Sequence, residues 1–152
     1  MSTLHTVNAP QTVDRILSFF PAPRHGQIRQ RLAENIAAVM SLRLLPRKSG
    51  RGMVPACELL LSTPRVRELL YDGQVSELSR VVEAGHEEGL ISFNHSLRLL
   101  VQQDVIELET ALAASDRPEE LLLALRGFSK GKGHPSPASG QSGRLRLAGG
   151  GE

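Results

Sequence analysis

The sequence has no tryptophan, only 3% aromatic residues and a single cysteine, Cys57, among its 152 residues. Because aromatics are scarce, leucine, valine, isoleucine and alanine must form the core. One cysteine excludes an intramolecular disulfide and an all-cysteine metal site within one chain, which fits a reducing compartment. No base stands beside Cys57 in the sequence, so we expect it to pack in an apolar strand and not to act as a nucleophile.

Long apolar runs are lacking as well. The first 30 residues contain no uninterrupted apolar stretch of signal-peptide length, and no apolar run reaches the roughly 18 residues that a membrane-spanning helix needs. Together with the cysteine usage, this pattern predicts a cytoplasmic location without direct membrane insertion.

The sequence also lacks a phosphate loop. The pattern G-x-x-x-x-G-K-[ST], whose backbone N–H groups and lysine hold nucleotide phosphates, occurs nowhere in it. Residues 127–133 (GFSKGKG) are rich in glycine and lysine, but the glycine spacing is wrong and no Ser or Thr follows the lysine. We interpret this stretch as a flexible basic linker.

Charge is present but unevenly placed. Residues 1–126 contain 14 Lys and Arg against 15 Asp and Glu, whereas residues 127–152 contain 4 against 1. A near-neutral body without a basic stripe argues against nucleic-acid binding, which needs clustered cations. In residues 127–152, Gly, Ser and Pro make up 14 of 26 residues, so we expect a disordered tail there.

Hydrophobic periodicity predicts a mainly helical chain with one hairpin. Helical spacing marks residues 10–20 and 25–42, and two apolar runs, 42–45 and 53–61, flank a glycine-rich turn. Pro55 disfavours a continuous sheet through the second run, and both faces of that strand are apolar enough to be covered. Start signals at Thr63, Ser92 and 116–117 then predict short helices at about 64–72, 75–88, 93–103, 106–114 and 118–126.

A metal site is not expected. His86 with Glu87 and Glu88, and His95 nearby, could be imagined as ligands, but a tetrahedral site needs three or four converging side chains. We interpret these residues as solvated helix faces. His5 taken alone is a frayed polar residue near a chain end, although an imidazole can donate to a phosphate oxygen.

Several short motifs in order resemble one known family. Residues 3–6 (TLHT) resemble the end of the histidine box of the type II/IV secretion ATPase superfamily, and residues 12–16 (TVDRI) with 20–21 (FP) resemble the segment after that box in the pilus-retraction, or PilT/PilU twitching-motility, branch. Residues 27–33, 44–47, 50–52 and 56–60 look like that branch's next segments, and 82–90, 96–97 and 118–121 keep the order. The resemblance covers roughly residues 3–126.

The resemblance also reaches an element associated with retraction. Residues 63–70 (TPRVRELL) resemble the A-I-R-x-L-I element of the branch, which implies a partner or retraction role for a set of five residues: Arg65, Val66, Arg67, Leu69 and Leu70. By the same resemblance, His5 and Arg15 would face a nucleotide phosphate. Arg15 has a simpler alternative, an ion pair with a neighbouring helix. No residue is assigned a catalytic role.

The family implies a fold and a domain division. We expect residues 1–61 to form the end of a RecA-like α/β core, 62–126 an all-helical C-terminal domain and 127–152 the disordered tail. Relatives bind ATP and Mg²⁺ and form cytoplasmic rings of six subunits, and their phosphate loop and acidic box would lie upstream of residue 1. The resemblance therefore covers only their last third.

Three functional hypotheses arise from this partial resemblance. The chain is a truncated retraction-ATPase homologue that does not hydrolyse ATP alone, because the loop that positions the phosphates is absent. Alternatively, it is a standalone module that docks on full-length ring subunits through the helix containing residues 65–70. A third hypothesis is a non-functional piece of a split gene. Uncovered apolar surface would in each case drive self-association.

Overall fold

The computed structural model describes residues 2–129. They form seven α-helices, two strands and three short 3-10 turns, which confirms the expected mainly helical class with one antiparallel hairpin. No helix of this described part is long and apolar enough to cross a membrane. In chain order the elements are α1 (Ala9–Ser18), η1 (Ala22–Arg24), α2 (His25–Asn35), β1 (Ala38–Pro46), β2 (Met53–Leu61), α3 (Pro64–Asp72), η2 (Val75–Glu77), α4 (Leu78–Ala84), η3 (His86–Glu88), α5 (Phe93–Gln102), α6 (Leu108–Ala114) and α7 (Pro118–Ser129).

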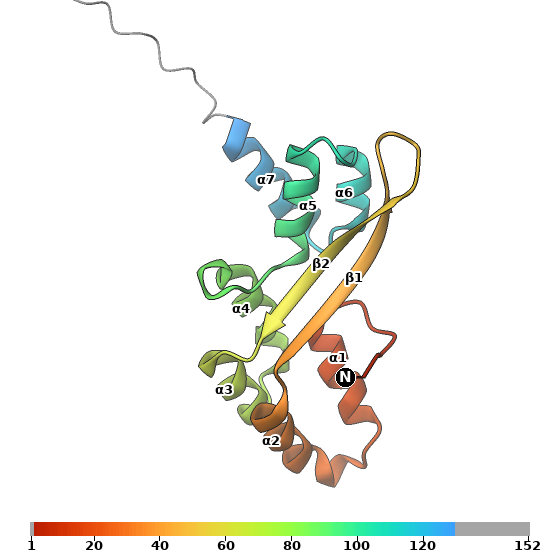
Figure 1. Cartoon of the computed structure of the whole chain (residues 1–152). Helices are drawn as coiled ribbons and strands as arrows, with labels where there is room; N and C mark the ends of the chain where they lie inside the picture. The colour runs from red at the N-terminus through yellow and green to blue at the C-terminus, as the bar shows by residue number, and fades with distance from the viewer. Residues whose placement is uncertain (1, 130–152) are drawn as a thin grey trace, which may run out of the picture.

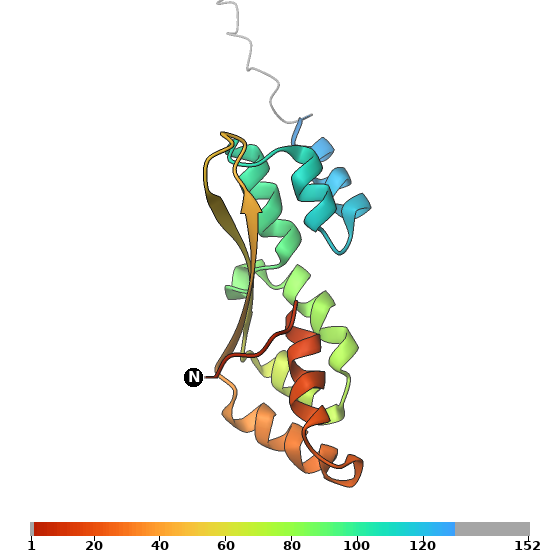
Figure 2. The same ribbon diagram turned by 90° about the vertical axis from the view of Figure 1, so that its right-hand side faces the viewer.

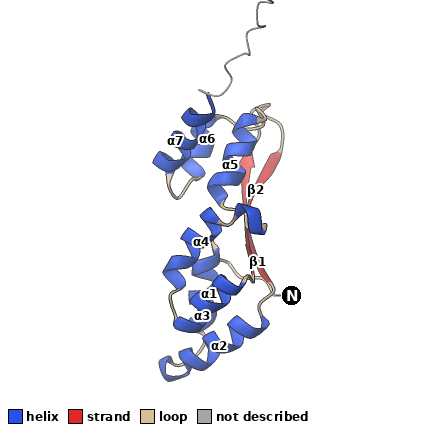
Figure 3. Ribbon diagram, turned by 90° about the vertical axis from the view of Figure 1, so that its left-hand side faces the viewer, coloured by secondary structure: helices blue, strands red, loops and turns tan. Residues whose placement is uncertain are grey.

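The β1–β2 hairpin is the spine of the molecule. Its antiparallel register runs without a break from Ala38 opposite Leu61 to Pro46 opposite Met53. Helices α1 to α4 gather around the open end of the hairpin and α5 to α7 around its turn (Figure 1). Viewed from the side, the helices lie against one face of the hairpin and leave the other face bare (Figures 2 and 3).

Two hydrophobic clusters correspond to these two groups of helices. We call α1 to α4 with the open end of the hairpin the N-terminal lobe, and α5 to α7 with the turn end the C-terminal lobe. The first cluster is centred on fully buried leucines of α3, α4 and β2, and the second on α5, α6 and α7. Helices α3 and α4 share the first cluster with α1 and α2, and the domain division at residue 61 stays a prediction. The buried members are Ala9, Val13, Leu17, Ala33, Val39, Leu60, Val66, Leu69, Leu70, Val75, Leu78, Val82 and Leu90 in the first cluster, and Leu45, Val54, Ala56, Phe93, Leu97, Ile106, Ala111 and Leu121 in the second.

Local capping explains where three helices begin. The side chains of Asn8, Thr63 and Ser92 each accept a hydrogen bond from a backbone N–H of the first turn of α1, α3 and α5. Such caps satisfy donors that have no partner within the helix. Helix α3 ends at Gly73, whose φ of 76° lies in the left-handed region that glycine adopts without strain.

The helix predicted over residues 25–42 is too long. Helix α2 ends at Asn35, Ile36 is already extended, and β1 begins at Ala38. The sequence of β1 does not show the usual alternation of apolar and polar residues. Its covered positions include Ser41 and the half-buried Arg43, whereas its exposed positions include apolar residues. Pairing with β2, which is distant in sequence, therefore overrides the local helical spacing.

The break predicted at Pro55 does not occur. Pro55 pairs with Leu44 inside the continuous register. Leu59 exchanges both backbone hydrogen bonds with Ile91, and the Cys57 N–H donates to Ser96 Oγ, so alternate residues of β2 direct their backbone groups away from β1. Pro55 follows the same alternation, and its missing N–H costs the hairpin no hydrogen bond.

The hairpin is covered on one face only, contrary to the expectation for β2. Alternation places the covered residues on one side, but the opposite side is largely open to solvent. We call this side the outer face, and its most exposed apolar residues are Met40 (64%), Leu42 (60%), Leu44 (65%) and Met53 (53%). Cys57 also lies on the outer face and is partly buried.

The expected tail is described only at its start. Residues 127–129 continue α7, which runs to Ser129, three residues beyond the predicted end of the last helix at 126. The remainder of the predicted tail, residues 130–152, lies outside the described residues, as does most of the 127–133 stretch.

Candidate functional site

The His5 segment precedes α1 as an extended stretch without regular structure. His5 is exposed, and its neighbour Thr6 is linked to α1 by a 2.7 Å hydrogen bond between the Thr6 and Thr12 hydroxyls. Thr12 Oγ1 also donates to the Asn8 carbonyl at 2.9 Å. These contacts fix the segment beside the first turn of α1 and leave the His5 imidazole free to meet a ligand from outside.

Arg15 lies on the exposed side of α1. Its guanidinium carbon is 5.1 Å from the centre of the Phe19 ring, four residues on, and it makes no ion pair within residues 2–129. A contact within its own helix therefore replaces the expected alternative, an ion pair with a neighbouring helix. No hydrogen bond or ion pair joins Arg15 to His5 within residues 2–129, and the nucleotide role of both stays a prediction.

Helix α3 contains the predicted retraction element, and its residues divide by exposure. Val66, Leu69 and Leu70 are fully buried in the N-terminal lobe. Arg65 and Arg67 are exposed: Arg65 pairs with Glu68 at 2.6 Å, and Arg67 Nε donates to Ser62 Oγ at 2.9 Å. The three apolar residues are therefore core residues in this structure, and a partner approaching α3 would meet the two arginines.

Charged residues outside the predicted site set occupy the junction between the lobes. Glu58, on the covered side of β2, is only 7% exposed, and its Oε1 accepts a 2.7 Å hydrogen bond from the Ala9 N–H at the start of α1. Burial raises the pKa of the Glu58 carboxyl, and the nearby carboxylates of Asp116 and Glu83 raise it further, whereas the Ala9 hydrogen bond and the Arg43 guanidinium oppose this rise. Glu58 thus ties α1, and with it the His5 segment, to the hairpin.

Arg43 joins the lobes from the neighbouring strand. Its guanidinium donates to both carboxylate oxygens of Asp116, at 2.9 and 2.8 Å, and to the Ala114 carbonyl at the end of α6. It also reaches the Val7 carbonyl at 3.4 Å and lies 4.1 Å from the centre of the Phe93 ring. One side chain therefore contacts the His5 segment, α5 and the α6–α7 connection.

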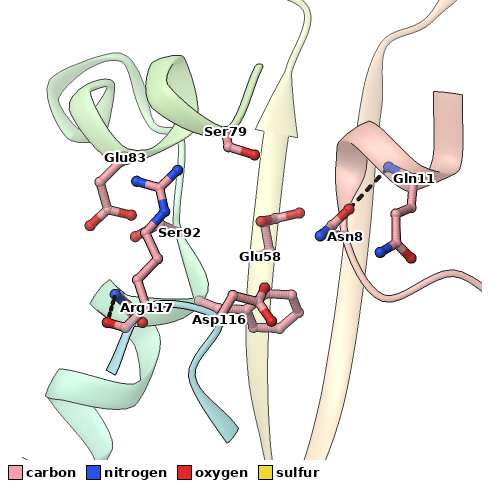
Figure 4. A pocket seen from close by; sticks show the side chains of 10 residues that line it. Asn8, Gln11, Glu58, Ser79, Glu83, Ser92, Asp116 and Arg117 are labelled. Carbon is pink, nitrogen blue, oxygen red and sulfur yellow. Dashed lines mark hydrogen bonds between the residues drawn. The ribbon is translucent and has the colours of Figure 1, made fainter. Parts of the chain in front are cut away.

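A cavity of about 250 Å³ lies between the lobes beside these two residues (Figure 4). Its walls come from α1, β2, α4, α5 and the α6–α7 connection, and its lining is mainly polar. The lining residues are Asn8, Gln11, Glu58, Ser79, Glu83, Ser92, Phe93, Asn94, Asp116 and Arg117.

His86 and His95 are in contact with each other, and His86, Glu87 and Glu88 are exposed, as expected for solvated residues, whereas His95 is half-buried. Their ring centres are 4.1 Å apart, and His86 Nδ1 lies 3.2 Å from the Leu90 carbonyl oxygen. Burial lowers the pKa of His95, and the neighbouring His86 and Arg98 lower it further. Within residues 2–129, no group of three or more His, Cys, Asp or Glu side chains is arranged to hold a metal ion.

One feature of the sequence could have indicated the residues that join the lobes. Arg43 and Glu58 are charged residues at covered positions of alternating strands, where an apolar residue is the usual choice. Their significance depends on the register, which places Ser41 opposite Glu58 and Arg43 opposite Ala56, and on contacts with Ala9 and Asp116 that are distant in sequence. No local motif predicts those contacts.

Comparison with known proteins finds clear relatives, although no family model matches the chain. The chain is 37% identical over 126 residues to the type IV pilus ATPase PilU of Pseudomonas aeruginosa. The aligned region covers 83% of this chain and 33% of that protein. It is 35% identical over 119 residues to a twitching motility protein of Neisseria gonorrhoeae, covering 78% of this chain and 32% of the relative.

A solved structure agrees with these relatives. The crystal structure of the pilus retraction motor PilT with bound ADP matches with a TM-score of 0.69 at 33% identity, over 80% of this chain and 33% of that one. The chain therefore spans about a third of the length of the relatives it matches.

Proposed function

Because the chain is homologous to the PilT- and PilU-type twitching-motility ATPases over about a third of their length, we propose that it supplies the hairpin and helical part of a type IV pilus retraction ATPase. The match to the retraction motor PilT, with most of this chain superposed at 33% identity, is the observation that carries the proposal. The proposed activity is mechanical: the part takes up movement from ATP hydrolysis elsewhere in a ring and passes it to the pilus machinery.

These 152 residues do not hydrolyse ATP by themselves in this proposal. Phosphoryl transfer depends on positioning and neutralising the phosphates, and no phosphate loop is present in the sequence. His5 and Arg15 instead complete a nucleotide site built by another polypeptide. Both side chains are exposed, which supports this role because they are accessible to a ligand from outside.

Turnover of Mg²⁺-ATP by the purified chain tests this part of the proposal. We expect phosphate release no faster than that of a matched His5→Ala variant, measured over the same enzyme concentrations. Magnesium-dependent turnover above this control would contradict the proposal.

The outer face of the hairpin is where we expect the rest of an ATPase core to pack. It exposes a row of apolar side chains, and the relatives contain two thirds of a chain that these residues do not include. Leu59 is opposite Met40, and its backbone N–H and C=O point away from β1 toward Ile91. In an antiparallel pair, the backbone groups of Met40, and of Leu42 and Leu44 at alternate positions, therefore point to the free edge of β1. An apolar face beside an unpaired strand edge is suited to strand addition.

Docking on a full-length ring, the second candidate function, uses this same face and can be measured directly. We expect the purified chain to bind full-length PilU-type ATPase, and Leu42→Glu to abolish binding because it buries a charge at the interface. Leu123→Glu, at a similarly exposed leucine of α7, is the matched control and should bind normally. Loss of binding in an Arg65→Ala, Arg67→Ala variant, with Leu42→Glu unaffected, would instead assign docking to α3.

A further inference from the structure

Two histidines meet where the chain passes from the N-terminal lobe to the C-terminal lobe. His86 lies in η3, directly after α4, and His95 lies in the first turn of α5. Their ring centres are 4.1 Å apart, and the ring planes are inclined at 38°. His86 is exposed and His95 is half-buried, so protons from the solvent reach the pair.

Hydrogen bonds fix His86 in the turn between α4 and α5. The Leu90 N–H donates to the Gly85 carbonyl at 3.0 Å, which closes the turn, and His86 Nδ1 lies 3.2 Å from the Leu90 carbonyl oxygen. Because a carbonyl oxygen only accepts, His86 Nδ1 carries a proton and donates it. Ile91, the next residue, exchanges backbone hydrogen bonds with β2. The His86 ring therefore has a fixed position against His95.

The His95 ring has the opposite requirement. One guanidinium nitrogen of Arg98, Nη2, lies 3.1 Å from His95 Nδ1. A guanidinium only donates, so His95 Nδ1 must accept, and the ring is neutral with its proton on Nε2. A proton on Nδ1 would place a donor against a donor and a positive charge beside the Arg98 guanidinium. The hydrogen bond from Arg98 therefore exists only while His95 is neutral.

Charged and titratable groups from four elements face His95 across a small cavity of about 40 Å³. They are Glu83 of α4, His86 of η3, Arg98 of α5 and Glu120 of α7. Burial lowers the pKa of His95, and His86 and Arg98 lower it further, whereas Glu83 raises it. Strand β2 and helix α6 also pack against α5, but among the described residues neither places a charged side chain in this cavity.

We propose that the contact between His86 and His95 is a pH-sensitive switch between the lobes, closed while His95 is neutral and opened when His95 takes up a proton. The proton on Nδ1 removes the acceptor of Arg98, and the imidazolium moves from that guanidinium toward the carboxylates of Glu83 and Glu120. Because the turn that holds His86 is bonded to β2, this movement loosens α5 from the N-terminal lobe. The switch is independent of the proposed nucleotide role.

The direction of the pH effect follows from the proton affinity of His95. Its pKa in the folded protein is lowered from the ordinary 6.5, so the unfolded state binds this proton more tightly than the folded state does. The stabilisation from the closed switch is therefore complete above pH 6.5 and is lost as the pH falls through the lowered pKa. Mildly acidic conditions open the switch.

An NMR titration of the full chain with isotope-labelled histidine side chains and backbone amides, from about pH 8 to pH 5, tests the switch. At the upper pH we expect the ring-nitrogen shifts of His95 to show the Nε2–H form, and its protonation midpoint to lie below 6.5. The amide resonances of Leu90 and Arg98 should shift with the same midpoint, since they lie in the turn and the helix that separate.

Two variants make the test specific. His95→Asn keeps an oxygen near the Nδ1 position for Arg98 but takes up no proton, so the pH-dependent shift of the Leu90 amide should disappear. Glu83→Gln keeps both histidines and removes a carboxylate that favours the imidazolium, so the midpoints of His95 and of the Leu90 amide should fall together. His25→Asn, at a histidine of α2, is the matched control and should leave both midpoints unchanged.

Three outcomes would overturn the proposal. A shift of the Leu90 amide that persists in His95→Asn would assign the change to another group, such as Glu58. Midpoints of His95 and Leu90 that separate in Glu83→Gln would show that the two events are not coupled. Protonation of His95 without any change in the turn would show that the contact does not respond to its charge.

Discussion

The two faces of the β1–β2 hairpin differ sharply although they belong to the same two strands. On the covered face Leu60 is 1% exposed and Ala56 is fully buried, whereas on the outer face Leu42 and Leu44 are 60% and 65% exposed. Both faces are apolar enough to be buried, but the helices of this chain cover only one of them. The comparison shows that an apolar strand pattern predicts a potential for burial, and that the partner must be sought separately for each face.

The covered face itself changes character along its length. Its two ends are apolar and belong to the cores of the two lobes. Its middle contains two charged residues, Arg43 and Glu58. The lobes therefore meet through hydrogen bonds and ion pairs, and each has its own hydrophobic cluster. Such a junction depends on a few directional contacts, which makes it sensitive to single substitutions.

The largest difference between the faces should appear when equal leucines are truncated. Leu60→Ala removes a fully buried side chain from the N-terminal lobe, and we expect a loss of about 2–5 kcal/mol in the free energy of unfolding. Leu42→Ala, on the outer face, should change it by about 0.5 kcal/mol or less. Urea denaturation followed by circular dichroism measures both. Similar losses in the two variants would show that the outer face is buried in solution.

A smaller effect is expected at the middle of the covered face. Arg43→Met keeps an apolar stem of similar length but leaves Asp116 and the Ala114 carbonyl without their donor, so we expect a loss of about 1–3 kcal/mol. Arg15→Met is the control, because that side chain is exposed and lies over the ring of Phe19. A double-mutant cycle with Asp116→Asn separates the ion pair from the other contacts. Additive losses would show that the pair contributes nothing by itself.

Glu58 should make the stability of the covered face depend on pH. Its pKa in the folded protein is raised above the ordinary 4.5, so the folded state binds the proton more tightly than the unfolded state. The resulting stabilisation is complete below that ordinary value and is lost as the pH rises through the raised pKa. Unfolding free energies measured at intervals from pH 4 to 7 should therefore fall more steeply for the wild type than for Glu58→Gln. Parallel profiles would contradict this assignment.

Sequence reasoning succeeded where the determinants are local. The predicted bounds of α3 and α5 lie within one residue of the observed ones, because Thr63 and Ser92 are helix caps that the sequence reveals directly. It failed at residues 36–42, because the helical spacing of Ile36, Val39 and Met40 mimics a continuing helix until β2 is available as a partner. Local spacing cannot reveal a pairing partner that lies some twenty residues away.

The candidate sites show the same limit. The motifs identified the His5 segment and the exposed arginines of α3, but spacing alone could not show that Val66, Leu69 and Leu70 face the core. Arg43 and Glu58 gain their importance from contacts with Val7, Ala9 and Asp116, which only the three-dimensional structure brings together. Residues that connect lobes have no short sequence signature, since their partners come from several elements.

The smallest effect on stability, and the clearest on association, should come from the outer face. Leu42→Ser combined with Leu44→Ser replaces two exposed apolar side chains, so we expect a change in unfolding free energy of about 1 kcal/mol or less in total. An apolar patch of this kind favours self-association, and sedimentation velocity over a range of concentrations should show the wild type forming larger species that the double variant does not form. Leu123→Ser on α7, at an equally exposed leucine, controls for the loss of a single isolated apolar residue. A wild type that stays monomeric at every concentration would show that the outer face does not associate with itself and would leave a different polypeptide as its partner.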